Sequence, residues 1–271
     1  MKVYSSPKLW RIHAPSLPDV MRYLSTTPRT WNINQGETAR PEKHWDLEAG
    51  WDGTLQLCRT GWAEGGQKMR LVLKQLGKVT TPQVQHKLNM EAGNFLMDRY
   101  LVGNPECFKA KVKTRKNVKP TVRFAVNISS NGGTSGQSLA NCGAAIAQAV
   151  KQLEATGNKV EVTAYDASLM NAGKRIVTGW NVKRADAKLD MAALAFSIAH
   201  PAAMRRIGFA LMERAPMEFY TGSYGSATEL LHSDLEHTDS IVFNVCLTAG
   251  TTCKTPELAV QTINRLLATQ R

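Results

Sequence analysis

The chain has 271 residues, 43% of them hydrophobic and 21% charged, and this ordinary balance for a folded protein excludes disorder as the default. A chain of this length can bury a sizeable core as one large domain or two modest ones. Lys and Arg number 34 against 22 Asp and Glu, and the resulting net charge of +12 favours a polyanionic partner.

Membrane and secreted classes are disfavoured. No apolar run approaches the roughly 18 residues that a membrane helix needs, and the N-terminus turns polar too early for a secretory signal. Five cysteines without CxxC spacing predict reduced thiols that fill the core. We therefore expect a cytoplasmic protein without membrane contact, in the host cytoplasm if it is viral.

Residues 1–100 are expected to form a mainly helical, tryptophan-rich part. A strand at 9–14 precedes a helix that Ser16 caps. A long polar loop is predicted over 26–44. Helices follow near residue 52 and over 69–76.

Residues 101–271 are expected to form an α/β part, and the two parts one compact unit. Strands are predicted over 108–114, 121–128, 159–165, 176–182 and 240–247. Helices are predicted over 138–155, on either side of His200-Pro201, and from Thr255-Pro256-Glu257 onward. This alternation predicts an α/β fold with a central mixed sheet flanked by helices.

The positive charge is concentrated in a span without any acidic residue, between Glu106 and Glu154. Strands 108–114 and 121–128 lie in this span and are predicted to pair as a hairpin. A basic hairpin suits a nucleic-acid backbone. A solvated edge strand that lysines protect against aggregation is the alternative.

The first strand of this hairpin would project three ammonium groups from one face, at Lys109, Lys111 and Lys113. Like charges that close repel one another, so a polyanion would stabilise them. The turn and the second strand add four further candidates for phosphate contact: Arg115, Lys116, Lys119 and Arg123.

Aromatic side chains can stack unpaired bases. Trp31 and Trp45 are the candidates, because they fall in or beside the polar loop near Arg40 and Lys43. Adjacent residues on a helix point about 100° apart, so one arginine of the pair Arg205-Arg206 is expected to reach solvent and the other to tie the helix to the fold. Arg205 completes the predicted nucleic-acid site.

Catalytic motifs are missing. Loop 129–136 leads from a strand into a helix, a setting that cradles phosphate, but neither GxxxxGK[ST] nor GxGxxG is present. The spacing Asn127-x-Ser129-x-Asn131 resembles the metal-binding loop of von Willebrand factor A-like folds, with asparagine replacing the first aspartate and its charge. We therefore expect no metal, no cofactor and no enzymatic activity.

Two alternatives stay open. One is a metal- or nucleotide-dependent enzyme of nucleic-acid metabolism that uses loop 129–136. The other is a basic adaptor that binds an acidic protein partner.

Several motifs resemble those of little-characterised phage and mobile-element proteins: Trp51-Asp52-Gly53-Thr54, Gly61-Trp62-Ala63-Glu64-Gly65, Gly103-Asn104-Pro105-Glu106-Cys107, Gly143-Ala144-Ala145-Ile146 and His200-Pro201-Ala202. Within that group the chain is similar to the Drc-type single-stranded-DNA-binding RNA polymerase cofactors of podoviruses that carry a virion RNA polymerase. The resemblance implies a fold that is not an OB-fold, single-stranded DNA as ligand, and a phage RNA polymerase that is recruited to melted middle promoters. It leaves open whether the chain forms a homo-oligomer.

Overall fold

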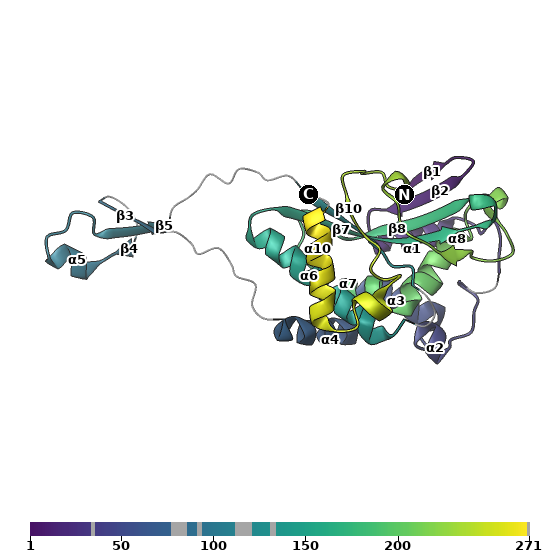
Figure 1. Cartoon of the computed structure of the whole chain (residues 1–271), viewed down its shortest axis with the longest axis horizontal. Coiled ribbons are helices and arrows are strands. Elements are labelled where there is room, and N and C mark those ends of the chain that lie inside the picture. Colours follow the sequence, from purple (N-terminus) through teal and green to yellow (C-terminus); the bar gives the residue numbers. More distant parts are fainter. Residues whose placement is uncertain (34–35, 77–85, 91–93, 112–120, 131–133, 270–271) are drawn as a thin grey trace.

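Within the described residues, seven strands form a central mixed sheet (Figure 1). The computed structural model describes the chain except for residues 34–35, 77–85, 91–93, 112–120, 131–133 and 270–271, and at 44, 86–87, 89 and 110–111 it describes the backbone alone. Neighbouring strands follow the order β1 (Lys2–Ser5), β2 (Leu9–Ala14), β8 (Arg175–Lys183), β7 (Lys159–Leu169), β6 (Thr121–Asn127) and β10 (Ile241–Phe243). The short β9 (Ser226–Ala227) pairs with β7.

The sheet mixes both strand directions. β7, β6 and β10 run parallel to one another, β8 runs antiparallel to β7, and β2 runs parallel to β8. The fold class is α/β, as the alternation of elements predicts. β1 and β2 come from the first hundred residues, so the sheet takes strands from both parts of the chain that the sequence distinguishes.

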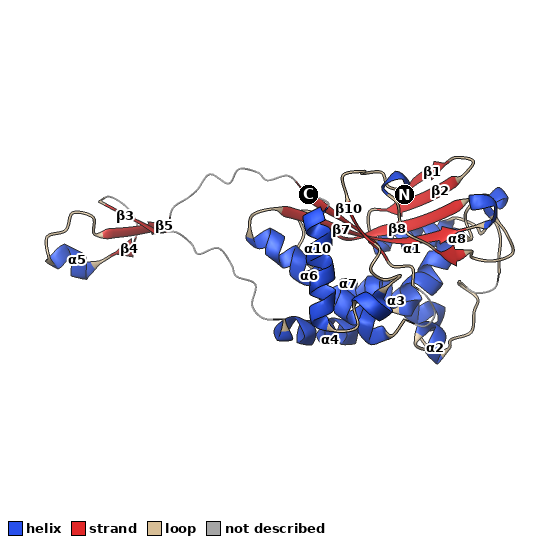
Figure 2. Cartoon of the chain, viewed as in Figure 1, coloured by secondary structure: helices blue, strands red, loops and turns tan. Residues whose placement is uncertain are grey.

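Helices cover one face of this sheet (Figure 2). They are α1 (Leu17–Thr26), α2 (Lys43–Asp46), α3 (Gly50–Thr60), α4 (Ala63–Gln75), α6 (Gly136–Ala155), α7 (Met191–Ala199), α8 (Phe209–Met212), α9 (Ala249–Thr252) and α10 (Pro256–Thr269). In the described part of the chain, no helix combines the length and the apolar character that crossing a bilayer requires.

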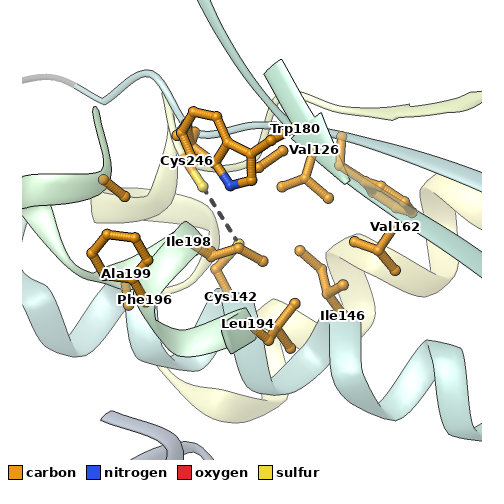
Figure 3. Packing of buried hydrophobic residues seen from close by; sticks show 14 of the residues in the cluster. Val126, Cys142, Ile146, Val162, Trp180, Leu194, Phe196, Ile198, Ala199 and Cys246 are labelled. Atoms are coloured by element: carbon orange, nitrogen blue, oxygen red, sulfur yellow. Dashed lines mark hydrogen bonds between the residues drawn. The ribbon is translucent and has the colours of Figure 1, made fainter. Parts of the chain in front are cut away.

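Alternation along the strands divides the core between the two faces. Phe124 and Val126 of β6 join the main cluster beneath the helices, whereas Ala125 between them joins a second cluster with Leu230 and Leu235. Figure 3 shows sheet residues packed over α6 and α7. All five cysteines lie in the described residues and are free and buried, as core-filling thiols should be.

Local signals explain several element ends. The Ser16 hydroxyl accepts the backbone N–H of Asp19 at the start of α1, and Asp190 accepts two backbone N–H groups at the start of α7. The last predicted strand is shorter than expected, because the side chain of Asn244 bonds both backbone groups of Leu230 just after β10.

Two glycines let α4 approach α7 closely. A Cβ atom on Gly61, whose φ is +71°, would lie 2.5 Å from the carbonyl carbon of Ala192. At Gly66 it would lie 3.1 Å from the carbonyl oxygen of Met191. The backbone N–H of Trp62 also donates to Ala192 O at 2.9 Å. Only glycine fits where the two backbones meet this closely.

A second sheet of three strands has the order β3 (His86–Asn89), β5 (Phe108–Lys111) and β4 (Asn94–Phe95), with α5 (Met97–Leu101) beside it. We call these four elements the small sheet unit, and Figure 1 draws it apart from the central sheet. The chain enters it after α4 and returns to β6.

The predicted hairpin is therefore wrong. β5 pairs with β3 and β4, whereas β6 pairs with β7 and β10. The physical reason lies in β6, whose residues 124–127 are all buried. A strand that is apolar on both faces belongs inside a parallel sheet under helices, where a lysine-bearing partner such as β5 could not be covered.

Candidate nucleic-acid interface

The predicted basic residues divide between the two sheets. Lys109 lies on β5 and is exposed, and the backbone of Lys111 lies two residues further on the same strand. Arg123 lies on β6 of the central sheet, where its guanidinium binds Asp239 at 2.9 Å. Four of the predicted residues lie outside the described ones: Lys113, Arg115, Lys116 and Lys119.

Strand register fixes which residues lie opposite Lys109 and the backbone of Lys111 in the small sheet unit. Lys109 lies opposite Leu88 of β3 and Asn94 of β4, and Lys111 lies opposite His86. Residues that face each other across antiparallel strands share a face, and alternate residues on one strand do so too. Of the three lysines predicted to share a face, only Lys109 has its side chain among the described residues, so the shared face stays a prediction.

The opposite face carries three aromatic side chains, of which Phe95 contacts the other two. Phe95 lies opposite Phe108 in the register, with ring centroids 5.4 Å apart. Tyr100 of α5 lies 5.3 Å from Phe95. Phe95 is 45% exposed and Tyr100 is 60% exposed. We call Phe95, Tyr100 and Phe108 the aromatic cluster.

The aromatic cluster is absent from the predicted site. Phe95 and Tyr100 fall in a stretch whose periodicity is ambiguous, so the sequence offers no signal for their exposure. Phe108 does have one, because the alternation that directs Lys109 to one face directs Phe108 to the other.

The segment around the small sheet unit is strongly basic. Between residues 77 and 120 the sequence has nine Lys or Arg and three Asp or Glu, a net charge of +6. Half of the whole chain's net charge of +12 therefore falls in this segment. Charge and exposed rings coincide in one part of the chain.

Trp31 is buried, so its predicted role in stacking bases is wrong. Its side chain is only 5% exposed, its indole N–H donates to Ala215 O at 3.1 Å, and its ring contacts Tyr220 and Tyr224. The polar loop folds back onto the body, where the backbone N–H groups of Thr30 and Trp31 donate to Glu213 O and Arg214 binds Thr27 O.

Arg205 and Arg206 divide their roles as the helix geometry predicts. Arg206 is fully buried, binds Asp46 at 2.5 Å, and donates to the carbonyls of three loop residues: Gly36, Ala39 and Arg40. Arg205 is half-buried, with its guanidinium 4.8 Å from the ring centre of Trp45 and bound to Trp45 O. Trp45 also contacts Phe209, so Arg205 and Phe209 each cover part of its ring.

Arg40 and Lys43 are exposed on the segment that Arg206 anchors. They lie near Trp45 in the chain. The structure therefore keeps Arg40, Lys43, Trp45 and Arg205 on the main body, while Lys109 and Lys111 lie in the small sheet unit.

In the loop that resembles a metal site, the side chains of Asn127 and Ser129 are hydrogen-bonded to other parts of the protein. The Asn127 amide nitrogen donates to Thr228 O at 2.8 Å and to Asn244 Oδ1 at 2.9 Å, and the Ser129 hydroxyl donates to Asp166 Oδ1 at 2.7 Å. Burial raises the pKa of Asp166 to about 6, although the Ser129 hydrogen bond opposes this rise. Among the described residues, no three His, Cys, Asp or Glu side chains are grouped as a metal site would require.

Comparison with curated proteins and with solved structures found no match. Residues 2–268 match the model of a protein family described as "Domain of unknown function (DUF7192)", and the chain therefore belongs to this family.

Proposed function

We propose that this protein binds single-stranded nucleic acid, DNA in particular, through the small sheet unit. The observation that supports this proposal is the exposed aromatic cluster on the small sheet unit, whose opposite face is that of Lys109 on β5, so a bound strand would reach both by passing around the edge of the sheet. Base stacking on an aromatic ring is worth about 1–3 kcal/mol per base. Lysines neutralise phosphates and release the counterions condensed on them.

The exposed rings favour single strands over duplex. In a duplex, each base is covered by its neighbours above and below, so a protein ring has access only where the stack ends. An unpaired strand can turn its bases onto Phe95 and Tyr100, which are 45% and 60% exposed.

A protein that holds one strand of a melted promoter could serve as the transcription cofactor that the resemblance implies, with a phage RNA polymerase as its partner. Recruitment of this polymerase stays part of the proposal. It requires a second surface besides the aromatic cluster.

The test replaces the rings by another large apolar side chain that has no π-system. In the variants Phe95→Leu and Tyr100→Leu, we expect the Kd for fluorescent oligo-dT to rise roughly 5- to 150-fold, because a leucine cannot stack a base. Fluorescence anisotropy measures this, with a duplex of the same length as a second ligand.

Tyr4→Leu is the matched control, because Tyr4 is an exposed tyrosine on β1 of the central sheet. It should leave the affinity unchanged. Unchanged affinity in both ring variants would contradict the proposal. If the protein instead bound an acidic polypeptide and did not bind DNA, the result would favour the alternative of a basic adaptor.

A further inference from the structure

The main body contains a cavity of about 710 Å³ that the small sheet unit does not line. It lies where α4, the first turn of α6 and the end of α7 meet. Its volume is in the range of sites for small organic ligands. Its apolar wall includes Leu47, Ile128, Leu139 and Met204.

One end of this cavity is the N-terminus of α6, a helix of 20 residues. The Ser135 hydroxyl accepts the N–H of Ser138, and Leu139 N–H bonds to Ser135 O. The N–H groups of Gly136 and Gln137 precede the first helical hydrogen bond and have no acceptor within the helix. No acidic residue lies in this first turn. The end of α6 therefore offers donors and a positive dipole to an anion.

The charged groups that line the cavity are also mainly cationic. They are Lys43, Lys68 and Arg205 against one carboxylate, Glu64. Glu64 binds Lys68 at 2.8 Å, and the four lining side chains together carry a net charge of +2.

His200 provides an independent sign of a ligand. It lines the cavity and is only 6% exposed. Its Nδ1 accepts the N–H of Ala202 at 3.2 Å. Burial lowers the pKa of His200 to about 4, so at neutral pH the ring proton lies on Nε2. Nε2 makes no hydrogen bond to a described residue, and the ring, which lines the cavity, packs against Trp62 at an interplanar angle of 87° and also contacts Phe196.

We propose that this cavity binds an organic phosphate of nucleotide size. The phosphate lies against Gly136 and Gln137 at the start of α6, with Lys43 and Lys68 nearby. The organic part lies against the apolar wall and accepts a hydrogen bond from His200. This site is separate from the aromatic cluster, so neither proposal depends on the other.

The test uses isothermal titration calorimetry of the full chain with ADP, AMP, adenosine and inorganic phosphate. ADP should bind with one site per chain and more tightly than adenosine or phosphate. Gly136→Glu should weaken ADP binding at least roughly tenfold, because it adds a carboxylate where the phosphate would lie. A side chain at Gly136 meets no atom within 4 Å, so the fold tolerates it.

Gly250→Glu is the matched control, since Gly250 is equally open and does not line the cavity. His200→Asn keeps an acceptor for the Ala202 N–H but removes Nε2, and it should also weaken ADP binding. Absence of ADP binding, equal affinity in Gly136→Glu, or equal binding of ADP and inorganic phosphate would overturn the proposal. ADP binding should be unchanged in Phe95→Leu and Tyr100→Leu even if these variants lose oligo-dT binding, so each proposal can be contradicted without the other.

Discussion

Asp166 is buried within β7, where the loss of solvent disfavours the charged form of its carboxyl group. One of its oxygens accepts the Ser129 hydroxyl, and the other, Oδ2, has no hydrogen-bond partner among the described residues. Burial raises its pKa from 3.8 to about 6. Between pH 3.8 and about pH 6, Asp166 is therefore protonated in the folded protein and ionised in the unfolded chain.

This shift predicts a pH dependence of stability. A raised folded-state pKa gives stability that is full below about pH 4 and is lost as the pH rises through about 6. In Asp166→Asn this loss is absent, so its free energy of unfolding, relative to wild type, should increase by up to roughly 3 kcal/mol between pH 4 and pH 8. Urea denaturation of both proteins across this range measures the difference. Parallel curves would contradict the assignment.

At the scale of elements, the contact between α4 and α7 shows how backbone and packing combine. Gly61 has a φ of +71° and approaches Ala192, whereas Gly157 after α6 has a φ of +90° and no neighbour within 4 Å of an added Cβ. Both conformations favour glycine: the positive φ of Gly157 costs other residues about 1–2 kcal/mol, and Gly61 combines its φ with a ψ of −179°, a region that is essentially restricted to glycine.

The two glycines form a matched pair for mutation. Gly157→Ala should lower the free energy of unfolding by about 1–2 kcal/mol, through backbone strain alone. Gly61→Ala should lower it by roughly 1–3 kcal/mol more, because its methyl group overlaps the backbone of α7 and its φ and ψ are those of a region restricted to glycine. Thermal and urea unfolding of both variants provide the measurement. Equal losses would mean that α4 and α7 can separate at no cost.

Element ends were the most predictable features, and strand partners the least. Ser16 and Thr255-Pro256-Glu257 predict the starts of α1 and α10, because helix capping depends on residues that are close together in the sequence. The partner of β5 depends on contacts far apart in the chain. Two adjacent strands of matching alternation look like a hairpin, whether or not they share a sheet.

The candidate site was predictable to a similar degree. The lysines of β5 follow from alternation, which is local. The burial of Trp31 does not, because it depends on Arg206 and Arg214, whose carbonyl partners lie more than 160 residues away in the chain. The sequence around Trp31 is polar, so composition alone predicts an exposed loop.

At the scale of the whole molecule, charge and core are separated. Half of the net charge lies between residues 77 and 120, whereas the buried core lies in the central sheet and its helices. We expect the two properties to be separable by replacement of 77–120 with a Gly/Ser linker of equal length.

The replaced protein should keep its melting temperature within a few degrees and lose affinity for oligo-dT. In the wild type, about five phosphate contacts would give a log–log salt slope near −3.5, and the replacement should bring this slope close to zero. Anisotropy titrations at four salt concentrations measure both quantities. A slope that survives the replacement would place the binding surface on the main body.

The close approach of α4 to α7 has a consequence for how the cavity between them would take up a ligand. Gly61 and Gly66 bring the two helices into backbone contact, and the N–H of Trp62 fastens one to the other. We therefore expect these walls to move together and the cavity to be preorganised. An incoming ligand would lose its own freedom but would order little of the protein. Its association should follow a single exponential whose rate rises linearly with ligand concentration, without the plateau that a slow opening step would impose.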